Sequence, residues 1–213
     1  MPTLISRQII ATVCTSALLI LSICGCRSEY ESNSYISQYS IIVGIEITGS
    51  YTPKTENNLL LSFRLATKNH VSIASKDEDK QLYNQIRTIN GDTTFYGKVK
   101  KNGAFISGGH ALYPNVSAIN LTCSIDFDEK HPAGTSLNDC FELEYSHFER
   151  FNDKGIVKKR TKMSDIEKIK CIVSDKCDIY YCNPPATRQM TTITLTITMD
   201  NGDVYEDKYP GMI

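Results

Sequence analysis

The residues best suited to chemistry lie in one acidic stretch that ends at a histidine. Asp126, Asp128 and Glu129 offer carboxylate oxygens for calcium, and His131 beside them has the side chain of a general base. Neither role is well supported. The stretch has no nucleophile motif such as Gly-x-Ser-x-Gly, and Gly134 comes too late for a calcium loop. We therefore expect Asp126 and Asp128 to brace the loop through hydrogen bonds to its backbone, with no catalytic, cofactor or metal role.

The cysteines are the second group with reactive side chains. Five of them follow Cys26, namely Cys123, Cys140, Cys171, Cys177 and Cys182. Because five is odd, at least one thiol stays free or pairs with another chain. Cys177 and Cys182 bracket Asp-Ile-Tyr-Tyr just before a Pro pair, and we predict a disulfide between them. Zinc at Cys171, Cys177 and Cys182 is the alternative, but their spacing is too wide and no histidine is near. Cys123 and Cys140 lie where an apolar side chain would fit, as small buried hydrophobes do.

The N-terminus has the layout of a secretory signal peptide over residues 1–25. Arg7 precedes an interrupted apolar run that is shorter than the roughly 20 residues of a spanning helix. The end of the run resembles a bacterial lipobox, which needs a small residue before the lipidated cysteine. Cys26 follows Gly25, whereas Cys24 follows the bulky Ile23. We therefore predict that cleavage exposes Cys26 and that Cys26 carries the lipid.

Lipidation at Cys26 predicts an outer-membrane protein that reaches the membrane only through its N-terminal lipid, on the periplasmic or the cell-surface face. Residues 26–37 are polar and are expected to be a tether. Glu29 and Glu31 within them resemble the acidic export signal of Bacteroidetes surface lipoproteins, or are simply solvated.

Composition limits the partners. The chain has 213 residues with 23 Lys and Arg against 24 Asp and Glu, so it gives no case for a nucleic-acid partner. Residues 38–213 are enough for one core, and we expect one domain there. Tyr occurs 12 times and Trp is absent, which slightly weakens the case for a glycan partner.

The chemistry-bearing residues must be held mainly by strands. Residues 40–51, 58–68 and 115–127 are β-branched or alternate in polarity, which predicts strands. The clearest element is last: Ile193, Leu195, Ile197 and Met199 alternate with threonines. An Asn-Gly turn then starts a returning strand, so we expect a hairpin with one wet face.

Helices are expected to be few. Residues 76–87 predict a short helix, and residues 161–174 carry apolar side chains at helical spacing after a Ser cap. A second hairpin is expected around Lys101-Asn102-Gly103. Together these elements predict an all-β fold, an antiparallel Ig-like β-sandwich with one or two short helices in its loops.

Two stretches also resemble a known group. "SIDFDEKHPAGTSLNDCFEL" and "NPPATRQMTTITLTITMDNGDVYED" are similar to motifs of an uncharacterised small lipoprotein family of Bacteroides and related Bacteroidetes. The resemblance covers about half of the mature chain, and it implies an envelope location and an Ig-like sandwich. The family has no established activity, so no reaction is implied.

The functional expectation is a lipid-anchored, non-enzymatic binding module with a glycan or protein partner. Two alternatives stay open. One is a structural subunit of an outer-membrane assembly, and the other is a hydrolase whose carboxylates, such as Asp126 and Glu129, come together from loops.

Overall fold

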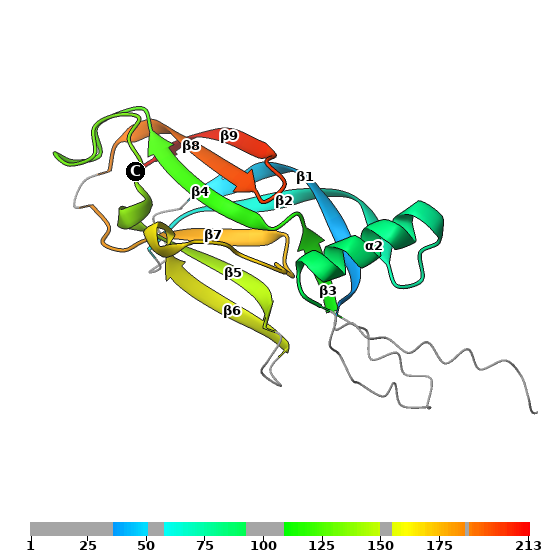
Figure 1. The fold of residues 1–213 in the computed structure, drawn as a ribbon. Helices are drawn as coiled ribbons and strands as arrows, with labels where there is room; N and C mark the ends of the chain where they lie inside the picture. The colour runs from blue at the N-terminus through cyan, green and yellow to red at the C-terminus, as the bar shows by residue number, and fades with distance from the viewer. Residues whose placement is uncertain (1–35, 51–57, 93–108, 150–154, 186–187) are drawn as a thin grey trace, which may run out of the picture.

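Two β-sheets pack face to face in the computed structural model, which describes residues 36–50, 58–92, 109–149, 155–185 and 188–213 (Figure 1). The first sheet has the strand order β3-β1-β2-β7-β5-β6. Its strands are β1 (Ile36–Ser50), β2 (Leu59–Ser72), β3 (Gly109–Tyr113), β5 (Phe141–Glu149), β6 (Gly155–Lys162) and β7 (Lys176–Tyr181). The second sheet has the order β4-β8-β9, with β4 (Val116–Cys123), β8 (Met190–Met199) and β9 (Val204–Met212). The predicted all-β sandwich is confirmed, although β1 and β3 pair in parallel.

The core lies between the two sheets because each sheet turns one apolar face inward. Phe63 and Phe141 from the first sheet meet Leu121 and Leu195 from the second, and all four side chains are fully buried. Burying a side chain of this size contributes about 1.5–3 kcal/mol. Alternation along each strand therefore determines which residues hold the sandwich together.

The closing hairpin follows the sequence pattern closely. Ile193, Leu195, Ile197 and Met199 are all buried on one face of β8. The chain then turns at Gly202, whose φ of 92° lies in the left-handed region that glycine tolerates. The Asp203 amide donates to Asn201 Oδ1, so the Asn-Gly turn is closed by its own side chain.

Helix α2 (Asp77–Ile89) confirms the predicted short helix and covers a second, smaller core. Acidic residues occupy its first turn, where the helix dipole favours negative charge. Tyr83 and Ile86, three residues apart on one face, are its buried residues. The Tyr83 hydroxyl donates to the Ile36 carbonyl at 2.8 Å, which ties α2 to the start of β1.

The predicted helix over residues 161–174 is wrong. Only Met163–Asp165 form one 3₁₀ turn, η2, and the chain after it is irregular, with single β-bridges at Ile169 and Ile172. The reason is tertiary: Ile169 exchanges two backbone hydrogen bonds with Val116, and Ile172 bridges to His147. Strands of both sheets therefore satisfy the backbone groups that a helix would have paired internally.

Some sequence predictions concern residues that the structure does not describe. The hairpin around residues 101–103 lies outside the described residues, as do Cys26 and most of the tether. The first described strand begins at Ile36, two residues before the predicted boundary at 38, and Ile36 is 1 % exposed.

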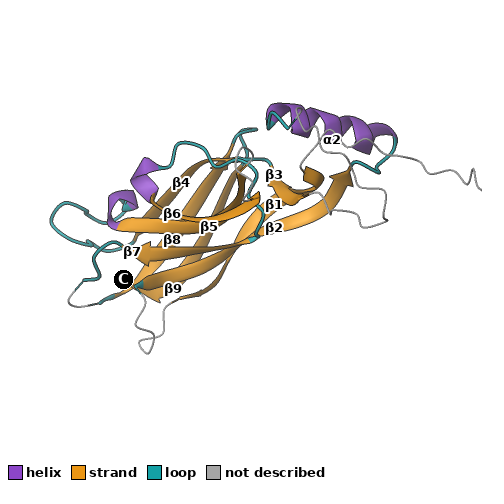
Figure 2. Cartoon of the chain, turned by 90° about the horizontal axis from the view of Figure 1, so that it is seen from below, coloured by secondary structure: helices purple, strands orange, loops and turns teal. Residues whose placement is uncertain are grey.

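The elements are distributed between two ends of the sandwich. Helix α2 and the start of β1 lie at one end, and the short 3₁₀ turns lie at the other (Figure 2). The loop 124–136 that follows β4, and η1 (Asn138–Cys140) after it, occupy this second end (Figure 1). The loop with the predicted acidic residues is therefore remote from the point where β1 begins.

Candidate functional site

The loop 124–136 is shaped by its own acidic side chains. Asp128 Oδ1 accepts hydrogen bonds from the backbone amides of Lys130 and His131 at 2.8 and 2.9 Å. Asp126 Oδ1 accepts one from the Ala133 amide at 2.8 Å. The expectation that these two carboxylates brace the loop is thereby confirmed. Glu129, the third predicted oxygen ligand, is exposed at the loop surface.

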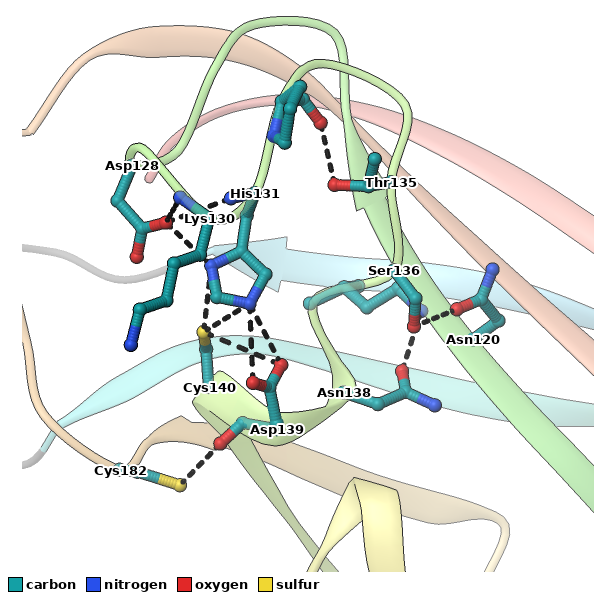
Figure 3. A network of polar contacts seen from close by, with 12 residues as sticks. Asn120, Asp128, Lys130, His131, Thr135, Ser136, Asn138, Asp139, Cys140 and Cys182 are labelled. Carbon is teal, nitrogen blue, oxygen red and sulfur yellow. Dashed lines mark hydrogen bonds and ion pairs between the residues drawn. The ribbon is translucent and has the colours of Figure 1, made fainter.

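The loop and η1 together enclose the imidazole of His131 between two carboxylates (Figure 3). Its Nδ1 lies 2.7 Å from Asp128 Oδ1, and its Nε2 lies 3.1 and 3.2 Å from the two oxygens of Asp139. The His131 side chain is only 12 % exposed, while that of Asp139 is 64 % exposed. The ring is therefore covered, while both of its carboxylate partners face solvent.

The geometry favours a protonated His131. The hydrogen bond with Asp128 raises its pKa; desolvation opposes the rise, and the hydrogen bond and charge of Asp139 add to it. Desolvation raises the pKa of Asp128, but the hydrogen bonds from His131 and the loop amides outweigh it and hold this pKa below its usual value. An imidazolium whose two N–H groups both donate to carboxylates has no lone pair with which to accept a proton. In its protonated form His131 is thus a cationic brace between the two carboxylates and has no free nitrogen to act as a general base.

Cys140 completes the cluster from the end of η1. Its Sγ lies 3.8 Å from His131 Nδ1 and 3.7 Å from Nε2. Burial raises the pKa of this thiol to about 12, and the negative charge of Asp139 adds to the shift. Because the thiolate is the nucleophilic form, Cys140 is a poor nucleophile at neutral pH despite the histidine beside it.

Asp128, His131 and Cys140 are also the one described group whose donor atoms all lie within 4.8 Å of one another and suit a metal ion. Carboxylate, imidazole and thiolate are ligands that zinc accepts, at about 2.0–2.3 Å. A metal binds along the lone-pair axis of a ring nitrogen, but the sulfur is nearly equidistant from both nitrogens and lies on neither axis. These residues could hold zinc only if His131 gave up one of its two carboxylate hydrogen bonds and bound the metal through the nitrogen thus freed.

The cysteines named in the sequence-based zinc alternative do not come together. Cys171 belongs to the small core under α2, and Cys177 belongs to the main core. Cys182 lies beyond the end of β7 and is half-buried. Cys123 is buried as expected, whereas Cys140 is half-buried and contacts polar groups.

The predicted disulfide between Cys177 and Cys182 does not fit the structure, in which both are free thiols. Cys177 lies near the start of β7, and the extended strand carries the chain away from it before Cys182. A strand advances about 3.3 Å per residue, whereas bridged cysteines have Cα atoms within about 7 Å. The two residues are therefore too far apart to be joined.

Sequence reasoning identified Asp128 and His131 but missed Asp139 and Cys140. The sequence feature that could have pointed to them is the Pro132–Thr135 turn after His131. Thr135 closes this turn by donating from its amide and its hydroxyl to the Pro132 carbonyl. That turn sends the chain back past the histidine. The partners of His131 were therefore to be expected among residues 135–140.

The two-carboxylate arrangement predicts a pH-dependent stability. Because the folded pKa of His131 lies above its unfolded value of about 6.5, the stabilisation is complete below pH 6.5 and is lost as pH rises through the folded pKa. An NMR titration of the His131 ring should give a pKa above 6.5, and Asp128→Asn should lower it. Glu129→Gln, an exposed neighbour, is the control and should leave it nearly unchanged. A His131 pKa at or below 6.5 in the wild type would contradict the assignment.

No helix among the described residues is long and apolar enough to cross a membrane. The chain matches no protein-family model, no curated protein and no solved structure.

Proposed function

We propose that this protein is a lipid-anchored, non-enzymatic binding module of the bacterial outer membrane, of the kind found in small Bacteroidetes lipoproteins. Cys26, preceded by Gly25, is the lipid-bearing residue in this proposal. The loop 124–136 with η1 forms the contact surface for a glycan or protein partner.

The observation that carries the proposal is that the start of β1 and the loop 124–136 lie at opposite ends of the sandwich (Figure 1). The Ile36 amide donates to Asp92 Oδ2 at 3.1 Å, and its carbonyl accepts from Tyr83. Ile36, the first residue that the structure describes, is therefore firmly held beside α2. An anchor attached there would leave the loop 124–136 at the end that points away from the membrane (Figure 1). The intervening residues 27–35 can span at most roughly 30 Å when fully extended.

The chemistry of the cluster supports binding more than turnover. His131 has both nitrogens engaged by carboxylates, and the neighbouring Cys140 thiol has a pKa raised to about 12. Catalysis by this pair would need a free base and an accessible thiolate. The exposed carboxylate of Asp139 is instead available to contact a partner at the loop surface.

Substituting the two candidate cysteines one at a time tests the anchor. Cys26→Ala should abolish incorporation of labelled palmitate and release the protein from the membrane fraction. Cys24→Ala, two residues away, should leave both unchanged, because its bulky Ile23 neighbour does not fit the processing site. Mass spectrometry of the wild-type N-terminus should find an acylated Cys26. An unmodified N-terminus, or one at another residue, would overturn the anchor.

A photo-crosslinking residue at either end of the domain tests the contact surface in intact cells. Placed at the exposed Lys130 in the loop, it should capture an envelope component, whose digestion by protease or by glycosidase shows its class. The matched control is the exposed Gln85 on α2, at the other end. Equal capture from both sites, or capture from Gln85 alone, would contradict the assignment. Turnover of a polysaccharide or peptide that is lost in His131→Gln would contradict the non-enzymatic role.

A further inference from the structure

We infer that Cys140 and Cys182 form a disulfide bond in an oxidising compartment. Strands β5 and β7 pair antiparallel with Phe141 opposite Tyr181 and Glu142 opposite Tyr180. The next pair outward in this register is Cys140 opposite Cys182. The Cys182 amide donates to the Cys140 carbonyl at 2.9 Å, so the pairing continues to these two residues.

The register sets a separation that a disulfide can span. Residues opposite each other in a hydrogen-bonded antiparallel pair have Cα atoms about 5.5 Å apart. Bridged cysteines usually have Cα atoms about 4.4–6.8 Å apart. Cys182 therefore has a suitable partner across the strands, in place of Cys177 along its own strand.

The solvent exposure of the five cysteines also favours Cys140 and Cys182 as the pair. Cys140 and Cys182 are half-buried, whereas Cys123, Cys171 and Cys177 are buried. Both sulfur atoms also lie against one residue: Cys140 Sγ is 3.8 Å from Asp139 Oδ1, and Cys182 Sγ is 3.9 Å from the Asp139 carbonyl oxygen. In Figure 3 the Cys140 sulfur points to His131, so the bridge requires it to turn toward Cys182.

The oxidant is a disulfide of the compartment, either a small molecule such as oxidised glutathione or a protein disulfide. The Cys182 thiolate attacks one sulfur of the oxidant, giving a mixed disulfide and releasing one thiol. The Cys140 thiolate then attacks the Cys182 sulfur and releases the second thiol. Two electrons pass to the oxidant, and the two cysteine protons end on the released thiols.

The surroundings favour Cys182 as the first nucleophile. Burial raises the pKa of this thiol and Glu142 adds to the rise, but Lys162 and Arg160 oppose it. Burial and the negative charge of Asp139 raise the pKa of Cys140 further, to about 12, even with His131 beside it. Oxidation should therefore be faster at pH 8.5 than at pH 6.5, because it depends on the thiolate.

Formation of the bridge in cells rests on the proposed export, so the purified protein is tested separately. The reduced full-length chain is incubated with oxidised and reduced glutathione, alkylated with N-ethylmaleimide, unfolded and digested with trypsin. Mass spectrometry should find the peptide 131–150 linked to the peptide 177–188. Because the latter contains Cys177 as well, the variants decide: Cys182→Ser and Cys140→Ser should abolish the link, and Cys177→Ser should retain it.

Three outcomes are informative. No linked peptide, or a link that survives in Cys182→Ser and is lost in Cys177→Ser, overturns the inference. The same alkylation applied to intact cells should show Cys140 and Cys182 protected. If the bridge forms in the purified protein and both thiols are free in cells, the cross-strand geometry stands and the bridge in cells is refuted. The membrane and palmitate measurements on Cys26 then show whether the proposed export has failed.

Discussion

Replacing Phe141 with alanine should lower the free energy of unfolding by about 3–5 kcal/mol, the range for deleting a buried aromatic ring. Phe141 is fully buried at the start of β5. Its ring centroid lies 5.0 Å from that of Tyr181 and 5.9 Å from that of Phe127. The loss therefore combines apolar burial, two aromatic contacts and a cavity between the sheets. Urea denaturation followed by circular dichroism measures it.

The same substitution should loosen the functional loop. The Phe127 ring also packs edge-on against His131, with centroids 6.1 Å apart. Loss of Phe141 should let Phe127 move and expose the histidine, which moves the His131 pKa toward 6.5. Ile156→Ala, on the edge strand β6 at 59 % exposure, is the control and should change stability by no more than about 0.5 kcal/mol. Equal effects of the two variants would contradict this account of the core.

Replacing Asn115 with alanine should lower the free energy of unfolding by about 3 kcal/mol, because it removes three hydrogen bonds of one buried side chain. Asn115 is 2 % exposed. Its Nδ2 donates to Asn90 Oδ1 at 2.7 Å and to Asp200 Oδ2 at 2.9 Å, and its Oδ1 accepts from the Cys171 amide at 3.1 Å. One side chain thus connects the end of α2, the β8–β9 turn and the irregular segment after η2.

Hydrogen exchange tests this connection more specifically than global stability does. In Asn115→Ala, amides at the C-terminal end of α2 and around residue 171 should exchange faster than in the wild type, while those of β5 should change least. Asn183→Ala makes the same chemical change at an exposed position and should be within about 0.5 kcal/mol of the wild type. A stability loss below about 1 kcal/mol for Asn115→Ala would show that water replaces the amide and that the network is not essential.

Local patterns were enough for much of the scaffold. The alternation along β8 and its Asn-Gly turn predicted the closing hairpin, because strand period and turn chemistry act within a few residues. The same reasoning predicted α2 nearly to its ends. It was wrong over residues 161–174, where helical spacing of apolar residues was overridden by backbone pairing to Val116 and His147.

Residues close together in the chain were enough to predict the all-β class and the loop-bracing roles of Asp126 and Asp128, both of which the structure confirms. Lipidation of Cys26 stays a prediction. Packing of the whole domain was needed to bring Asp139 and Cys140 around His131, and to place Cys182 opposite Cys140 and far from Cys177. Strand register brings together residues 42 positions apart, and no spacing in the sequence specifies which of the buried and half-buried thiols will meet.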